Sequence, residues 1–273
     1  MTCFTQKRSE IALVLFSGWC LMASCAFGFA QAGGESKIGN LTGHADSGKA
    51  LYRRYCISCH GVHGDGDGES APQLDPKPRD FTKATFKCRS TPSGSLPTDT
   101  DLYDTISRGI YNSNMPQWRP LTRQQRADLI AFVKTFSPRF QEEKPGVSIS
   151  IPPEPPTSSD SVQRGAQLYQ DMNCWSCHGK EGRGNGPSAA ALTDSKGHPI
   201  QPFDFTSGTH VKCGDGGTAM FRDFMTGLDG TPMPSFADTL KPDQAWDLVH
   251  FIEALPAASK KGISLIKADP KGE

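Results

Sequence analysis

Two short segments combine thiols and an imidazole at a spacing that suits one kind of chemistry. The pattern Cys-x-x-Cys-His occurs at 56–60 and again at 174–178. On one helical turn the two thiols lie close together, so each can add to one vinyl group of the same porphyrin, and the adjacent imidazole can coordinate its iron. We therefore predict two covalently bound haem c groups. The attachment residues are Cys56, Cys59, Cys174 and Cys177, and the proximal ligands are His60 and His178.

Two other functions of a Cys-x-x-Cys pair fit the sequence less well. A zinc site needs further Cys or His pairs at finger spacing, and a redox dithiol needs a strand–helix framework; the sequence has neither. Composition alone predicts about 0.008 Cys-x-x-Cys-His segments in such a chain, against the two observed.

A methionine follows each motif histidine at the same distance. Met115 and Met233 both lie 55 residues after their histidines, each in a polar loop and each followed by proline. The proline stiffens the loop and removes a backbone donor, which favours a thioether held on iron. We predict these two as the sixth ligands. The other methionines of the second domain are expected in the core (Met172, Met220, Met225). The remaining histidines are expected to be surface or secondary residues (His44, His63, His198, His210, His250).

The two motifs belong to a larger internal repeat. Both the Cys-x-x-Cys-His segments and the Met-Pro pairs recur at an offset of 118 residues, and Asp-Phe-Thr at 80–82 recurs at 204–206. This repetition predicts two domains, at 41–137 and 160–258, with a tail at 259–273. The proline-rich segment 138–159 between them is expected to be an extended, semi-rigid, non-helical spacer.

Each half is expected to be helical. Capping boxes are predicted at Thr122/Gln125 and Asp160/Gln163, opening helices over 123–136 and 162–170. Middle helices are expected at 99–108 and 217–226, each ending at a glycine, and a last helix begins at Pro242. No alternating strand pattern is present, so the predicted fold class is all-α.

Each half resembles a class I cytochrome c domain, and the whole is similar to two-domain dihaem cytochromes c. The resemblance rests on an N-terminal helix with Gly48 and Tyr52, or Gly165 and Tyr169, then the motif, the Met-Pro loop and a C-terminal helix. It implies that the terminal helices cross, with the glycine allowing close approach and the aromatic ring filling the contact.

Cys88 and Cys213 depart from the general pattern of that family. They occupy equivalent positions, each directly after a lysine. Three states are open: a disulfide, two separate thiols, or a thiolate ligand that displaces Met115 or Met233.

The N-terminus has the layout of a secretory signal peptide. Lys7 and Arg8 precede an uncharged apolar run at 11–30, followed by a small-x-small site, so cleavage after Ala32 is expected. A lipoprotein variant with Cys25 at its new N-terminus is the minor alternative. Both place the mature protein in the periplasm.

The net charge and the predicted iron ligands limit the functions that the protein can have. With 29 basic and 29 acidic residues, the chain has no net charge and no sign of a nucleic-acid partner. An iron whose two axial positions are occupied by His and Met has no vacant site and suits single-electron transfer between respiratory partners. The expected donor is a quinol-oxidising complex or dehydrogenase, and the expected acceptor is a terminal oxidase or reductase. Docking to a membrane complex is compatible with this function. The alternative is a dihaem oxidoreductase, of thiosulfate-oxidising or peroxidase type, with an open or Cys-ligated iron. A third reading, a sensing or structural subunit, has no support in the sequence.

Overall fold

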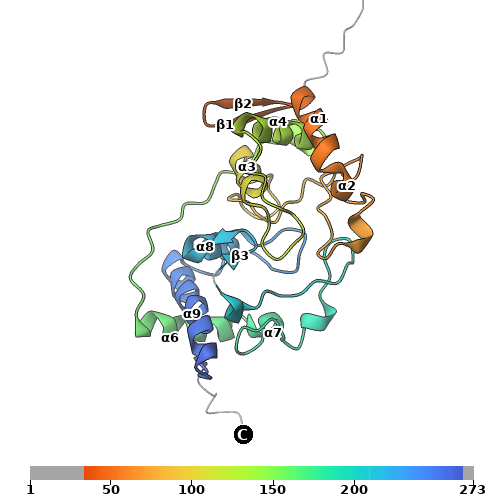
Figure 1. The fold of residues 1–273 in the computed structure, drawn as a ribbon. Coiled ribbons are helices and arrows are strands. Elements are labelled where there is room, and N and C mark those ends of the chain that lie inside the picture. The colour runs from red at the N-terminus through yellow and green to blue at the C-terminus, as the bar shows by residue number, and fades with distance from the viewer. Residues whose placement is uncertain (1–33, 209, 267–273) are drawn as a thin grey trace, which may run out of the picture. The chain divides into compact units, whose positions relative to one another are not determined.

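The computed structural model describes residues 34–208 and 210–266 (Figure 1). The predicted signal peptide at 1–32 and residues 267–273 lie outside this part. Within it, every helix is too short or too polar to cross a membrane.

The first half begins with a hairpin and continues with helices. In chain order its elements are β1 (Glu35–Ile38), β2 (Leu41–His44), α1 (Ala45–Tyr55), α2 (Ile57–His60), the 3₁₀ turn Ala71–Gln73, α3 (Asp99–Arg108), α4 (Arg123–Lys134) and α5 (Arg139–Glu142).

The second half repeats the order of the long helices. Its elements are α6 (Ser159–Asp171), α7 (Trp175–His178), the 3₁₀ turns Ala189–Ala191 and Phe205–Ser207, β3 (His210–Val211), β4 (Gly214–Asp215), α8 (Gly216–Thr226) and α9 (Pro242–Lys260). The predicted all-α class is confirmed, with short hairpins in addition.

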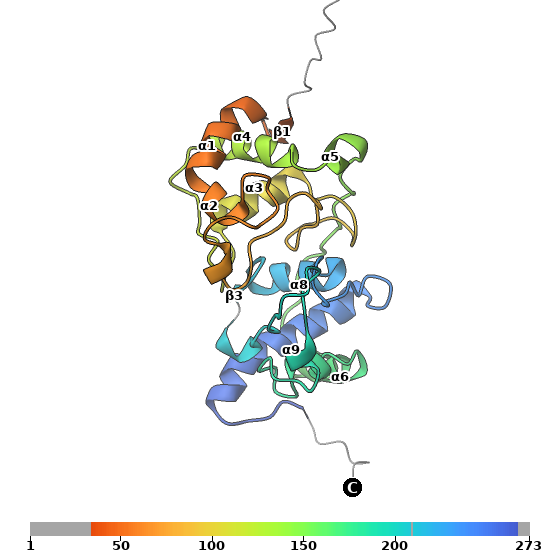
Figure 2. The same ribbon diagram turned by 90° about the vertical axis from the view of Figure 1, so that its right-hand side faces the viewer.

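The first and last helices of each half cross at a glycine. Gly48 in α1 lies against the Asp128 carbonyl of α4, and Gly165 in α6 lies against the Asp247 carbonyl of α9; a Cβ at either glycine would overlap that backbone. Figures 1 and 2 show α6 and α9 lying across one another. Tyr52 and Tyr169 fill the two crossings, with ring centroids 5.2 Å from Phe132 and 5.1 Å from Phe251.

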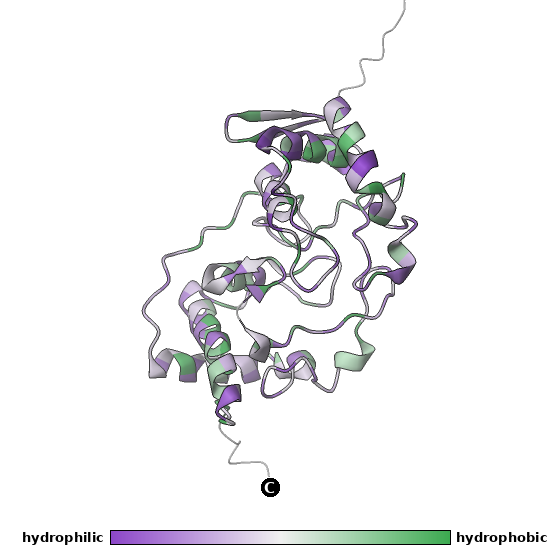
Figure 3. Cartoon of the chain, in the orientation of Figure 1, coloured by the Kyte–Doolittle hydropathy of each residue, from purple (hydrophilic) through white to green (hydrophobic). Residues whose placement is uncertain are grey.

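Each half has its own apolar core. One cluster of buried side chains runs from Ile38 to Val133, and the other from Ala166 to Leu255. In Figure 3 apolar and polar residues both occur along α4 and α9, as expected for helices that cover a core on one side.

The two hairpins were not predicted. In β1–β2, Glu35 pairs with His44 across a turn at Gly39, whose φ is +58°, and Ser36 Oγ donates to the Ala127 carbonyl of α4 at 2.8 Å. The β3–β4 pair has only two residues in each strand. Strands of two to four residues are too short to show a clear alternation in sequence.

The segment between the halves also differs from the prediction. It contains a short helix, α5, whose N-cap is Pro138. Proline is tolerated there, because the N–H of an N-cap residue makes no hydrogen bond within the helix. Beyond it the chain is irregular and attached to the first half: Ile149 N donates to the Ser90 carbonyl at 2.8 Å. The segment is therefore anchored to the fold along part of its length.

One capping box was predicted correctly and one was wrong. Thr122 and Gln125 form the box that opens α4, which ends two residues earlier than expected. The box of α6 is made by Ser158 and Ser161, not by Asp160 and Gln163. Two serine hydroxyls can exchange the same pair of bonds, so the observed cap lies two residues before the predicted one.

Candidate haem sites

Each Cys-x-x-Cys-His segment folds as one helical turn. In α2 the His60 N–H donates to the Cys56 carbonyl at 2.9 Å, and in α7 the His178 N–H donates to the Cys174 carbonyl at 2.9 Å. The four motif cysteines are not in disulfides. Burial raises the pKa of the first thiol of each pair, Cys56 and Cys174, to about 12.

A backbone carbonyl fixes each motif histidine. His60 Nδ1 lies 3.0 Å from the Arg79 carbonyl oxygen, and His178 Nδ1 lies 3.0 Å from the Phe203 carbonyl oxygen. A carbonyl only accepts, so Nδ1 carries the proton and Nε2 keeps its lone pair for a metal. Burial lowers the pKa of both histidines, which favours the neutral form needed for ligation.

A phenylalanine stacks on each of these rings. Phe81 lies on His60 with centroids 4.4 Å apart, and Phe205 lies on His178 at 4.5 Å. In both Asp-Phe-Thr repeats the threonine Oγ1 donates to the aspartate Oδ1 at 2.6 Å, which closes a tight turn around the phenylalanine. The sequence revealed this repeat but not its role beside the histidine.

The two Met-Pro loops have the same backbone arrangement. The Ile110 N–H donates to the Met115 carbonyl at 3.1 Å, and the Leu228 N–H donates to the Met233 carbonyl at 3.1 Å. Each loop follows a helix that ends at a glycine with positive φ, Gly109 after α3 and Gly227 after α8. The repeat thus extends to the hydrogen bonds of the loops.

Each half contains a cavity that joins its motif to its methionine. Cavity 1, of about 170 Å³, is lined by Cys56, Cys59, His60 and Met115, and also by Trp118. Cavity 2, of about 630 Å³, is lined by Cys174, Cys177, His178 and Met233, and also by Met172. The structure therefore brings every predicted attachment and ligand residue of a half to one cavity.

The lining fits a haem. Two thiols, an imidazole with a free Nε2 and a thioether are the donor set for covalent attachment and axial ligation. Cavity 1 is also lined by Trp118, whose buried indole N–H has no hydrogen-bond partner among the described residues and would suit an acceptor on the bound group.

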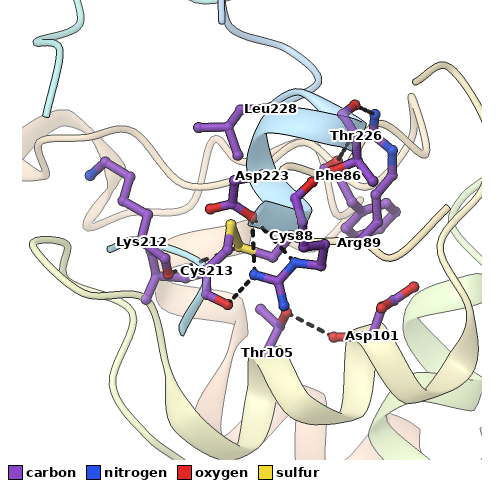
Figure 4. The surroundings of a disulfide bond; sticks show 12 residues. Phe86, Cys88, Arg89, Asp101, Thr105, Lys212, Cys213, Asp223, Thr226 and Leu228 are labelled. Carbon is purple, nitrogen blue, oxygen red and sulfur yellow. Dashed lines mark hydrogen bonds and ion pairs between the residues drawn. A yellow bond between two sulfur atoms is a disulfide. The ribbon is translucent and has the colours of Figure 1, made fainter. Parts of the chain in front are cut away.

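The two other cysteines of the described residues form a disulfide between the halves (Figure 4). Cys88 and Cys213 have Cα atoms 5.1 Å apart, and both are buried. Of the three states left open by the sequence, this structure contains the disulfide. A sulfur in that bond is not a thiolate, so these residues do not support a Cys-ligated iron.

The other methionines and histidines differ in how well they were predicted. Met220 is buried in the second core, and Met172 and Met225 pack against it. His250, expected to be a surface or secondary residue, is not at the surface: it is 1 % exposed, and its Nδ1 lies 2.9 Å from Ser161 Oγ, across the α6–α9 contact. A histidine surrounded by apolar helix residues is buried with them, which single-residue polarity does not predict.

The cytochrome c family model matches residues 45–137 and 162–256, which together make up more than half of the chain. The chain belongs to the cytochrome c family. This membership, with one motif in each matched region, gives the protein two cytochrome c domains, two covalently bound haem c groups and an electron-transfer function.

Several known proteins are similar to this cytochrome. A chain of the Kuenenia stuttgartiensis reducing HAO-like protein complex Kustc0457/Kustc0458 is 45 % identical, with a TM-score of 0.75, over 77 % of this chain and 96 % of that one. The cbb3-type cytochrome c oxidase subunit FixP of Rhizobium meliloti is 23 % identical over 91 % of this chain and 74 % of its own length. The cbb3-type cytochrome c oxidase subunit CcoP of Helicobacter pylori is 22 % identical over 72 % of this chain and 59 % of its own length.

Proposed function

We propose that this cytochrome is an exported electron-transfer protein whose two irons are closed by His60 and Met115 and by His178 and Met233. A bound haem c supplies one-electron exchange at its iron. The observation that carries the proposal is the shared lining of each cavity, where the motif histidine and the loop methionine occur together in both halves.

The residues around each iron then have separate tasks. The cysteines hold the haem covalently, and the carbonyls of Arg79 and Phe203 orient the two histidines. Methionine ligation raises the reduction potential relative to two nitrogen ligands and leaves no open position for a substrate. Such sites pass electrons without binding small molecules.

The names of the similar proteins support a place in a larger redox assembly. One comes from an HAO-like protein complex and two are oxidase subunits. We propose that this cytochrome likewise works against protein partners, taking electrons from a quinol-oxidising complex or dehydrogenase and giving them to an oxidase or reductase. Export to the periplasm is part of the proposal, because covalent haem attachment takes place outside the cytoplasm.

Near-infrared magnetic circular dichroism of the fully oxidised protein tests the ligands. Low-spin ferric haems give charge-transfer bands whose positions distinguish methionine, thiolate and two-nitrogen ligation. We expect two methionine-type signals of equal weight, one per haem. A high-spin or bis-nitrogen signal from either haem would contradict the proposed ligation.

Carbon monoxide binding by the reduced protein tests which methionine is the axial ligand of each haem. We expect wild type to bind none, Met115→Ala to open one haem, and Met233→Ala to open the other. Met172→Leu is the matched control, because Met172 also lines cavity 2. If Met172→Leu opens a haem and Met233→Ala does not, the proposed ligand is wrong.

A further inference from the structure

The two cavities are lined by one common basic residue. Lys87 of the first half is among the lining residues of both cavity 1 and cavity 2. Cavity 2 also takes Asp75, Pro76 and Asn112 from the first half, whereas cavity 1 is lined by first-half residues alone. The haem site of the second half is therefore completed by the first.

A lysine of the second half makes a contact with the first half. Lys212, the repeat equivalent of Lys87, lines cavity 2, and its Nζ donates to the Asn112 carbonyl in the loop that carries Met115, at 3.2 Å. Both lysines directly precede a cysteine of the Cys88–Cys213 disulfide, so that bond keeps them close together; Figure 4 shows Lys212 beside it.

These lysines and a nearby arginine form no ion pair among the described residues, although carboxylates such as Asp75 and Asp194 act on them at longer range. Among the described residues, no carboxylate oxygen lies within 4.0 Å of the side-chain nitrogens of Arg79, Lys87 or Lys212. Burial lowers the pKa of all three. The pKa of Lys87 is lowered to about 8, mainly by burial and in addition by the neighbouring charges of Arg79 and Lys212. Partly buried cations gathered in this way are stabilised by an anion.

The bound haems would supply that anion, because each carries two propionate carboxylates. Lys87 and Lys212 are the only cationic side chains that line cavity 2 in the described part of the chain. Cavity 1 is lined by Arg79, Lys87 and Lys77. Lys77 Nζ is held by two backbone carbonyls, those of Ala71 and Pro72, at 3.1 and 2.8 Å, whereas Lys212 Nζ donates to one, at the longer distance of 3.2 Å.

We propose that Lys87 is a positioning residue that binds propionate carboxylates of both haems and so raises both reduction potentials together. Lys212 acts in the same way on the haem of the second half alone. A positive charge near the haem stabilises the reduced, less positive iron centre, which is why its removal lowers the potential. The proposal depends on the two haems and not on the identity of the methionine ligands.

Spectroelectrochemical titration of the full-length, haem-loaded protein tests the proposal, with the two haems distinguished by their separate haem-methyl NMR signals. Lys87→Gln should lower both midpoint potentials, and Lys212→Gln only that of the second-half haem. Lys87→Arg should restore values near wild type. Lys83→Gln, at an exposed lysine of the same segment that lines neither cavity, measures the effect of a remote charge.

The proposal is overturned if Lys87→Gln shifts the second-half haem no more than Lys83→Gln does. A crystal structure of the wild-type protein with its haems is a second test that does not depend on how variants fold. It should place Lys87 Nζ at hydrogen-bond distance, about 3 Å, from propionate oxygens of both haems. Contact with one haem only, or with neither, would refute the proposal. If magnetic circular dichroism showed that methionine is not an iron ligand, the outcome of these two tests of Lys87 would be unaffected.

Discussion

Asp223 and Thr105 occupy equivalent positions, four residues before the glycines that end α8 and α3, and each lines the cavity of its own half. Burial raises the pKa of Asp223 to about 6, although the bonded Arg222, 3.0 Å away, acts to lower it. The second-half haem thus lies near a carboxyl group that titrates close to neutral pH, and the first-half haem lies near a hydroxyl that does not.

The potential of the second-half haem should therefore depend on pH. As pH rises through the pKa of about 6, Asp223 loses its proton and becomes negative, which stabilises ferric iron and lowers the potential. Most of the change should fall within about one pH unit on either side of that pKa. Spectroelectrochemical titration at several pH values measures it.

Asp223→Asn is the matched variant, because its amide oxygen can still accept from Arg222. It should flatten this part of the pH profile for the second-half haem and leave the first-half profile unchanged. An undiminished pH dependence in the variant would assign the titration to another group, such as the propionates.

Residue-scale prediction succeeded where chemistry restricts residue type. The attachment of a porphyrin requires two cysteines and a histidine at one spacing, so the sequence indicates them directly, and the structure brings Met115 and Met233 to the same cavities. The groups that hold the histidines could not be found in this way. Arg79 and Phe203 act through backbone carbonyls, which every residue has, and only the neighbouring Asp-Phe-Thr repeat marks the place.

Among the elements, the crossings of α1 with α4 and of α6 with α9 are the most constrained by backbone contact. A methyl group at Gly48 would overlap the Asp128 carbonyl, and α4 would have to move. That movement is restrained, because Gln124 Nε2 of α4 donates to the Thr42 carbonyl of β2 at 2.7 Å and to Asp128 Oδ1 at 2.9 Å.

Gly48→Ala should therefore lower the free energy of unfolding by about 1–3 kcal/mol, the usual cost of overpacking. Alanine has the better helix propensity, so a loss of stability here would report the contact and not the helix itself. Lys49→Ala, at the exposed neighbouring position of α1, is the control and should change stability by less than about 0.5 kcal/mol. Denaturant titration measures the free energy of unfolding of both variants. If Gly48→Ala lowers it no more than Lys49→Ala does, the helix crossing tolerates a side chain.

Element prediction from sequence depended on length. The helix at 99–108 was predicted with its observed ends, and Gly109 stops it as expected. The four residues of α5 and the short strands of both hairpins give too few positions for a period to appear. At these places tertiary contacts, such as that of Ser36 with Ala127, decide the structure.

At the scale of the whole molecule, the contact between the halves includes a buried charge. Arg89 is 1 % exposed, and its Nη2 donates to the Thr226 carbonyl at 2.5 Å and to Asp229 Oδ1 at 2.8 Å. Asp229 also accepts from Ser93 Oγ at 2.8 Å and from Gly94 N at 2.9 Å, both in the first half. One carboxylate of the second half thus neutralises and orders a loop of the first.

Asp229→Ala should destabilise the protein by about 3–5 kcal/mol, because it leaves the Arg89 charge buried without a counter-ion. Differential scanning calorimetry of the haem-loaded protein measures the loss. The control is Asp238→Ala, at an exposed aspartate of the same half. A loss no larger than that of the control would show that Arg89 is neutralised from elsewhere.

The Cys88–Cys213 bond, with a sequence separation of 125 residues, has a topological consequence. Together with the proline-rich segment it makes the backbone a closed ring, so the two halves are joined twice. Cutting the proline-rich segment would therefore leave a single two-chain molecule. Either connection alone keeps the two halves in one covalent molecule, so the sulfur bridge would still hold the mature pair together after the peptide linker is cut.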